Sequence, residues 1–262
     1  MRENNLRKIW AQGGAVVNGW LSIPSAFSAE VMAHQGFDSL VVDMQHGVVD
    51  YQVAVTMLQA ISTTSVVPMA RVPWLDPAII MKTLDAGAYG IICPMINTRQ
   101  QAETLVRICK YAPKGFRSFG PVRASIYAGS DYAQKANDEL VVMPMIETAE
   151  AVQNIDEILS VPGIDAVYVG PADLSLTLGC TPKLDQTEQP VVDALHKIAA
   201  ACKRHNVVPG LHNGTSSYAL KMIQEGWRFV TLASDSRFLA ARAAEEAGAV
   251  KKVAGGGKLP AY

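Results

Sequence analysis

Apolar residues in this chain gather into short continuous runs that alternate with amphipathic segments. Eight of the runs are rich in valine, isoleucine and leucine. They occupy residues 16–23, 39–44, 66–72, 90–96, 139–147, 166–171, 207–212 and 229–234. Continuous apolar character, as opposed to alternation, is typical of strands that are buried on both faces. The pattern therefore predicts eight buried strands.

The segments between these runs have the period of helices. The clearest amphipathic segments are residues 51–62, 98–110 and 191–202. Asp76 followed by Pro77 is a typical helix start, and Thr98 with Gln101 has the spacing of a capping box. Eight strands alternating with eight helices predict an α/β protein with a single domain, a (β/α)8 TIM barrel. An open doubly wound sheet is the alternative.

Two features fit this pattern less well. Four prolines lie within or near the predicted strands, where each removes a donor from the ladder, so we expect them near strand ends or bulges. They are Pro68, Pro94, Pro144 and Pro209. Residues 111–138 form a connection longer than is usual, which favours a functional or interfacial role. Its Arg117 and Arg123 are candidates for holding an acceptor carboxylate or a neighbouring subunit.

Composition and charge argue against some classes of partner. The chain has 262 residues and a net charge of -1, which gives no electrostatic reason to expect nucleic acid or an anionic membrane as a partner. Its four widely spaced cysteines favour reduced thiols, and no apolar run approaches the ~18 residues of a membrane span. We expect a cytoplasmic protein in which residues 1–250 form the barrel with a C-terminal helix. Residues 251–262 are expected to be a flexible, glycine-rich tail.

Polar side chains stand at the carboxyl ends of the predicted strands, which is where barrels of this kind carry their chemistry. They are Asp43, Gln45, His46, Arg71, Asn97, Glu147, Asp173, His212, Asn213, Ser234 and Asp235. Each has a structural alternative: Asp173 or Asp235 as a helix cap, Arg71 in an ion pair, His46 as a hydrogen-bonded histidine. Their coincidence on one rim favours an active site.

The residue types also make chemical sense together. Glu147 and Asp173 follow adjacent strands, so their oxygens can converge on one hard cation such as Mg²⁺ or Mn²⁺. A guanidinium such as that of Arg71 offers a planar fork to a carboxylate or an enolate oxygen. A neutral histidine such as His46 is a base that works near pH 7. No lysine ends a predicted strand, so nothing indicates a Schiff base.

Six motifs in order resemble the HpcH/HpaI aldolases, the metal-dependent class II pyruvate aldolases. They are VVDMQHG, ARVPW, MKTLDAGAYGIICPMI, QKAND, MIET and GPADLS, and the resemblance runs from about residue 19 to residue 242. It implies an enzyme that forms or cleaves a carbon–carbon bond between the enolate of pyruvate or hydroxypyruvate and an aldehyde, giving 4-hydroxy-2-oxo acids. It also implies a divalent metal ion, Mg²⁺, Mn²⁺ or Co²⁺.

The resemblance implies a role for each site residue. Glu147 and Asp173 match the carboxylates that bind the metal, and Arg71 matches the arginine at the keto oxygen. His46 matches the base, with Asp85 as the carboxylate that orients it and Asp43 nearby. The remaining residues implied to bind substrate are Gln45, Gly170, Pro171, Ala172, Asp173 and His212. Among them, the backbone amides of Ala172 and Asp173 would receive the substrate carboxylate.

Two departures from the family pattern bear on specificity. Met145 stands where many relatives have glutamine, which removes a polar contact near the metal. His212 stands where some relatives have an apolar residue. A polar group there favours a hydroxylated donor such as hydroxypyruvate or a shorter polar aldehyde. The alternative is that His212 is a loop residue that faces solvent.

Other functions remain open at this stage. An acyl-CoA lyase of the citramalyl-CoA or malyl-CoA type keeps the fold and the metal, but no basic cluster suits the phosphates of CoA. A sugar-phosphate isomerase would need phosphate-binding glycines after the last two strands. A barrel that binds a 2-oxo acid without turning it over is the non-enzymatic alternative.

The resemblance also implies a homo-oligomer, a hexamer built as a trimer of dimers that exchange a C-terminal helix. The alanine-rich residues 238–250 are the candidate for that helix. Their periodicity is equally consistent with a helix that closes its own barrel.

Overall fold

The computed structural model describes residues 1–254. Eight parallel strands form one sheet in the order β5-β4-β3-β2-β1-β8-β7-β6. The strands are β1 (Val16–Leu21), β2 (Ser39–Asp43), β3 (Val67–Arg71), β4 (Gly90–Cys93), β5 (Val141–Pro144), β6 (Ala166–Val169), β7 (Val208–Asn213) and β8 (Phe229–Leu232). A bridge between Met145 and Tyr168 joins the ends of the sheet and brings it close to a full barrel. The predicted (β/α)8 barrel is confirmed.

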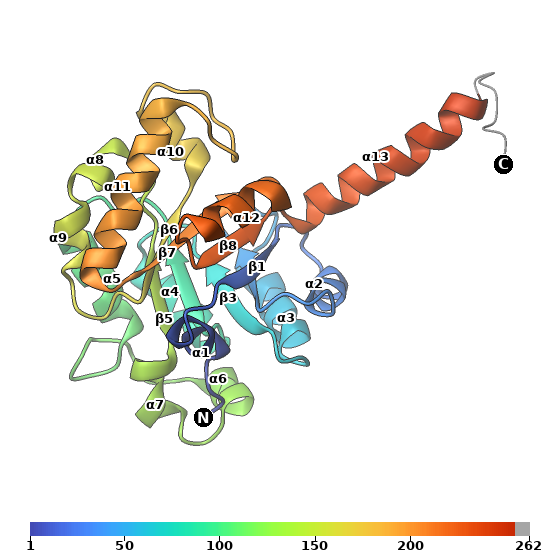
Figure 1. The fold of residues 1–262 in the computed structure, drawn as a ribbon. Coiled ribbons are helices and arrows are strands. Elements are labelled where there is room, and N and C mark those ends of the chain that lie inside the picture. The colour runs from blue at the N-terminus through green and yellow to red at the C-terminus, as the bar shows by residue number, and fades with distance from the viewer. Residues whose placement is uncertain (255–262) are drawn as a thin grey trace.

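Helices surround the strands (Figure 1). Those before the fifth strand are α1 (Asn5–Ala11), α2 (Ala26–Ala33), α3 (Tyr51–Ile61), α4 (Pro77–Asp85), α5 (Arg99–Cys109), α6 (Val122–Ala128) and α7 (Tyr132–Glu139). Those after it are α8 (Ala149–Gln153), α9 (Ile155–Leu159), α10 (Pro171–Thr177), α11 (Gln189–His205), α12 (Ser216–Gln224) and α13 (Asp235–Ala254). The predicted starts are confirmed, since Asp76 caps α4 ahead of Pro77 and Thr98 with Gln101 forms a capping box on α5.

The four strand prolines lie where a lost donor does least harm. Pro68 and Pro209 are second in β3 and β7, Pro144 ends β5, and Pro94 directly follows β4. This confirms the expectation that they lie near strand ends.

The long connection, residues 111–138, carries α6 and most of α7 and packs beside the chain's amino terminus (Figure 1). Arg117 Nη2 donates to Asp85 Oδ1 at 2.6 Å, and Arg123 Nη2 donates to Ser62 Oγ at 2.9 Å. Asp85 and Ser62 end helices that run back from the carboxyl end of the barrel. Both arginines therefore lie at its amino-terminal end, and the hypothesis that either holds an acceptor carboxylate is wrong within this chain.

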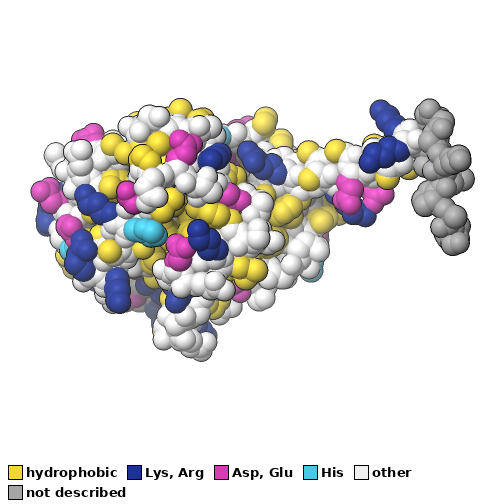
Figure 2. Space-filling view, turned by 45° about the horizontal axis from the view of Figure 1, so that its top comes forward, with side chains coloured by type: hydrophobic (Ala, Val, Ile, Leu, Met, Phe, Trp, Pro, Cys, Tyr) yellow, Lys and Arg dark blue, Asp and Glu magenta, His cyan; other side chains and the backbone are white. Residues whose placement is uncertain are grey.

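The last helix, α13, leaves the barrel and projects into solvent (Figures 1 and 2). It continues to Ala254, so residues 251–254 of the expected tail are helical, and residues 255–262 lie outside the described part. Of the two predicted alternatives, the helix does not close its own barrel. No helix within residues 1–254 is both long and apolar enough to cross a membrane.

Candidate active site

A cavity of about 400 Å³ opens at the carboxyl ends of the strands. Its walls bring together residues that end or follow seven of the eight strands, all except β4. The predicted residues among them are Asp43, His46, Arg71, Gly170, Pro171, Ala172, Asp173, His212 and Ser234. The structure therefore gathers most of the predicted rim around one space.

Asp43 and Arg71 form a buried ion pair in its wall. They face one another in the register of β2 and β3. Arg71 Nε donates to Asp43 Oδ1 at 2.8 Å and Nη2 donates to Oδ2 at 2.6 Å. Asp43 also accepts from Trp20 Nε1 at 3.1 Å and from the amides of Gln45 and His46.

These contacts set the charge of Asp43. Burial by itself raises its pKa, but the hydrogen bonds and positive charge of Arg71 outweigh burial and hold the pKa below its usual value. Asp43 is therefore ionised, and its oxygens are engaged in orienting the guanidinium. Asp43 thus positions Arg71, and a catalytic role of its own stays a prediction.

An aromatic surface lies beside this pair. Trp20 stacks on Tyr168, with ring centroids 5.4 Å apart, and the Arg71 guanidinium lies 4.8 Å from the Trp20 ring. His212 meets the edge of Trp20 at 5.0 Å. The guanidinium is thus held by a charge on one side and by a π-face on another.

Both ring nitrogens of His212 have protein partners. Nε2 lies 3.1 Å from the carbonyl oxygen of Ala233, which only accepts, and Nδ1 lies 2.9 Å from Tyr168 Oη. Nε2 therefore carries the proton and Nδ1 accepts from the tyrosine. Burial, followed by the positive charge of Arg71, lowers the pKa of His212 to about 4. His212 therefore lines the cavity with both ring nitrogens bonded within the chain, and its predicted part in substrate choice stays a prediction.

Glu147 and Asp173 lie at the same end of adjacent strands. Glu147 follows β5 and is buried, while Asp173 lies in the first turn of α10 after β6 and is exposed. Burial raises the pKa of Glu147 to about 7, against the amide of Met95, which donates to Oε1 at 2.9 Å. The negative charge of Asp173 raises it further, so the two carboxylates lie within electrostatic range of one another.

Gly170 makes this closeness possible. A Cβ at Gly170 would lie 2.5 Å from Glu147 Oε2 and 3.1 Å from Met145 Cε. Only glycine lets the start of α10 approach the Glu147 carboxylate. This steric requirement explains the glycine that opens the GPAD motif.

The remaining predicted residues are not brought together. The His46 ring is exposed at the cavity rim, whereas Asp85 pairs with Arg117 at the other end of the barrel. The prediction that Asp85 orients His46 is therefore wrong within this chain. The side chain of Gln45 does not line the cavity, and only its backbone amide takes part, through Asp43.

Several lining residues were not predicted. They are Trp20, Ser22, Tyr168, Leu184, Ala233 and Arg237, while Met145, which the sequence placed near the metal site, also lines the cavity. Trp20 and Tyr168 lie in two of the apolar runs. The only sequence feature that could have predicted their place in the cavity wall is an aromatic residue near the end of a strand. Asp235 instead serves as a structural acceptor for Ser22, Ile23 and Ser28.

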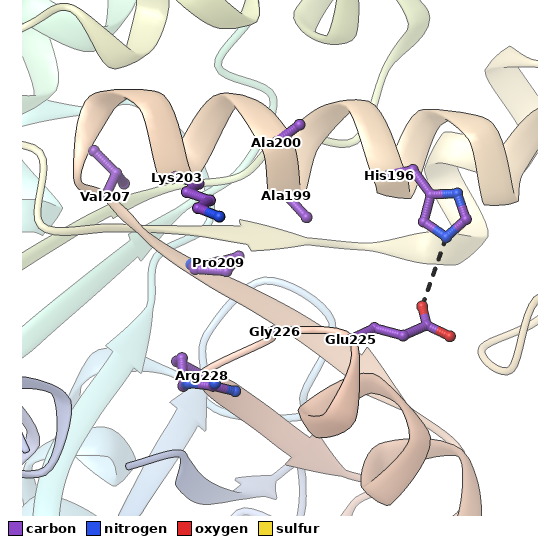
Figure 3. Close-up of a pocket in the computed structure, with 9 residues that line it drawn as sticks. All are labelled: His196, Ala199, Ala200, Lys203, Val207, Pro209, Glu225, Gly226 and Arg228. Carbon is purple, nitrogen blue, oxygen red and sulfur yellow. Dashed lines mark ion pairs between the residues drawn. The ribbon is translucent and has the colours of Figure 1, made fainter. Parts of the chain in front are cut away.

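A second cavity, of about 540 Å³, lies between α11 and α12 (Figure 3). His196 Nε2 lies 3.7 Å from Glu225 Oε2, an ion pair when the histidine is protonated, and Lys203 and Arg228 also line this cavity (Figure 3). Its walls include the beginnings of β7 and β8, the end of the barrel opposite the first cavity. None of the predicted site residues lines it.

Few side chains near the cavity could hold a metal ion. Within residues 1–254, no group of three or more His, Cys, Asp or Glu side chains is placed to hold a metal ion. The pair that the sequence indicated, Glu147 and Asp173, offers two carboxylates at the carboxyl ends of β5 and β6. A hard cation that keeps positions for water and substrate requires no more than one or two carboxylates.

An eight-stranded barrel with such a cavity at the carboxyl ends of its strands has the architecture of an enzyme. The family model for HpcH/HpaI aldolase/citrate lyase matches residues 18–241. The chain belongs to this family of carbon–carbon lyases.

Individual relatives agree with the family. A hydroxypyruvate/pyruvate aldolase from Rhizorhabdus wittichii is 44% identical over 92% of this chain and 96% of its own length. A 4-hydroxy-2-oxo-heptane-1,7-dioate aldolase from Shigella flexneri is 35% identical over 93% of this chain and 91% of its own. The crystal structure of a family member from Burkholderia cenocepacia superposes with a TM-score of 0.88 at 30% identity, covering 95% of this chain and 99% of that one.

Proposed function

We propose that this chain is a class II aldolase that joins the enolate of pyruvate or hydroxypyruvate to an aldehyde, or cleaves the resulting 4-hydroxy-2-oxo acid. The observation that carries the proposal is the buried carboxylate of Glu147, which lies directly behind Gly170, while Gly170 lines the cavity together with Asp173 and the Arg71 fork. The relative named hydroxypyruvate/pyruvate aldolase supports the choice of donor.

The two carboxylates fit a divalent cation. Their mutual repulsion and the burial of Glu147 raise the pKa of Glu147 to about 7, and neither carboxylate has an ion pair within residues 1–254. All-oxygen ligands suit Mg²⁺, Mn²⁺ or Co²⁺. When bound, the cation would polarise the keto group of a 2-oxo acid and ease loss of a proton from the adjacent carbon.

Arg71 supplies the second stabilising charge. Asp43 and Trp20 fix the guanidinium in one orientation, so it needs little reorganisation when charge develops on the enolate oxygen. Its remaining N–H groups are available to the substrate because Asp43 occupies only Nε and one hydrogen of Nη2.

The other roles follow from position. The exposed imidazole of His46 at the rim is the candidate to move the proton. The amides of Ala172 and Asp173 precede the first bond of α10, from Leu174 to Gly170, and are free to receive the substrate carboxylate. No lysine lines the cavity within the described residues, which argues against a Schiff base.

The thioester alternative finds less support. The arginines that line the cavity are Arg71, which is paired with Asp43, and Arg237. They form no basic cluster of the kind that would bind the phosphates of CoA.

The test is loss of the methyl-proton NMR signal of pyruvate in D₂O. We expect exchange that depends on Mg²⁺ and stops on addition of EDTA, and that is lost in Glu147→Gln and Asp173→Asn. Exchange that is absent from the intact protein with Mg²⁺ would rule the proposal out. Cleavage of an acyl-CoA instead would favour the thioester lyase, and stabilisation by pyruvate without exchange would favour a binder.

We also propose a homo-oligomer in which α13 packs on another copy of the chain. Phe238 and Leu239 are 41% and 65% exposed on α13, and Phe27 is 73% exposed on α2. A long helix that leaves its own barrel with exposed apolar side chains is typical of an element that packs against a partner. The hexamer with exchanged helices remains the form implied by the resemblance.

A further inference from the structure

One charged side chain of the cavity has no part in the chemistry proposed above. Arg237 lies in the first turn of α13, where its backbone N–H donates to Ser234 Oγ at 3.3 Å. Its side chain lines the same cavity as Arg71 and Asp173. It is exposed, and no carboxylate lies within ion-pair distance of it in the part of the chain that the structure describes.

The neighbouring acids have other partners. Asp235 is next in sequence, but its oxygens accept from Ser22 N and Ser22 Oγ at 2.9 and 3.0 Å and from Ile23 N at 3.2 Å. Asp43 is fully engaged by Arg71. The acids further along α13 pair with Arg242. Arg237 is therefore left as an uncompensated positive charge on the cavity wall.

Arg237 and Arg71 reach the cavity from different strands. Arg71 stands on β3, and its charge reaches Glu147. Arg237 follows β8, which neighbours the His212 strand β7, and the positive charges of both arginines lower the pKa of His212. A cavity of about 400 Å³ holds a three-carbon acid and leaves room for a second small molecule on this side.

We propose that Arg237 selects the aldehyde, favouring acceptors that carry an anionic group, a carboxylate or a phosphate, at the end remote from the carbonyl. The inference rests on the proposed aldolase function. A guanidinium binds either anion through two parallel N–H donors, and a charge-assisted contact of this kind discriminates strongly against an uncharged group.

Matched aldehydes test it with pyruvate as donor. Succinic semialdehyde is compared with butyraldehyde, and glycolaldehyde phosphate with glycolaldehyde, so that each pair differs in the anionic group. In Arg237→Gln we expect the preference for the anionic member, as a ratio of kcat/KM, to fall by about tenfold or more, mainly through KM. Loss confined to one pair assigns the anion as carboxylate or as phosphate, and Arg237→Lys should restore part of it.

The control is Arg242→Gln, which removes a positive charge from α13 outside the cavity and should leave both ratios unchanged. Ratios that stay the same in Arg237→Gln, or an equal fall for charged and neutral aldehydes, would overturn the proposal. Exchange of pyruvate protons in the unmodified protein needs no aldehyde. It therefore reports separately on the proposed function.

Discussion

At the scale of single residues, the site depends on side chains whose charge state is set by a neighbour. Arg71 is fixed by Asp43, and Asp43 is kept ionised by Arg71. Burying either charge alone is unfavourable, so removal of one partner leaves the other uncompensated. The pair is expected to act as one unit.

The first prediction follows from that unit. Arg71→Lys should lower kcat for pyruvate proton exchange about a hundredfold or more, because a lysine lacks the fork that stabilises the enolate. Asp43→Asn should lower it too, and the double variant should be little worse than Arg71→Lys alone. Effects that multiply would instead give Asp43 a separate catalytic role.

The second prediction concerns His212 and pH. Its pKa is about 4 in the folded protein, against an ordinary 6.5. As pH falls below 6.5, the unfolded chain takes up a proton that the folded protein does not. The free energy of unfolding should therefore decrease between pH 6.5 and about 4 and be unaffected by this group above pH 6.5.

Urea unfolding of His212→Gln at several pH values measures this contribution. The variant should show a shallower loss of stability on acidification than the unmodified protein. His34→Gln, which removes an exposed histidine at the end of α2, is the control and should keep the steeper dependence. Equal slopes for all three proteins would contradict the prediction.

At the scale of elements, the junction between β6 and α10 decides whether the two carboxylates meet. The strand ends at Val169 and the helix begins at Pro171, so Gly170 is the whole connection. Proline fits the first helical position, and the missing side chain of Gly170 admits Glu147.

The third prediction is that Gly170→Ala weakens metal binding about tenfold or more, since its Cβ would displace the Glu147 carboxylate. Calorimetric titration with Mn²⁺ measures the affinity, and circular dichroism checks that the barrel is folded. Gly120→Ala is the control, because a Cβ there meets nothing within 4 Å. Unchanged affinity in a folded Gly170→Ala would remove the steric argument.

At the scale of the whole molecule, the barrel is complete without α13. The helix begins at the cavity, where Asp235 ties it to the loop after β1, and then runs away from the body (Figure 1). Assembly through α13 would therefore act directly on the wall that holds Arg237.

The fourth prediction is that Leu239→Glu shifts the protein to a smaller species in light scattering after size-exclusion chromatography. A carboxylate in place of an apolar side chain opposes burial at an interface. Leu176→Glu on α10, where the leucine is 59% exposed, is the control and should leave the mass unchanged. A full-length protein that is already monomeric would contradict the proposed assembly.

The barrel and the family were predictable from the sequence, and the site was predictable in part. The apolar runs place all eight strands, and parallel order then sends Asp43, Arg71 and Glu147 to one rim. Trp20 and Tyr168 were missed because an aromatic residue inside an apolar run resembles any other core residue. Arg237 was missed because a helix pattern does not tell which side chain turns toward a cavity.

The sequence by itself determined where the strands lie, which of them end in polar residues, and where the helices start. These features depend on local periodicity and on capping over a few residues. Only the tertiary structure decided the partners. Asp85 meets Arg117 across 32 residues, and Asp43 meets Arg71 across 28. The sequence alone offers several arginines, among them Arg71, Arg117 and Arg123, as partners for Asp43 and Asp85. The choice rests on strand register and on which end of the barrel each helix reaches, and no local pattern records either.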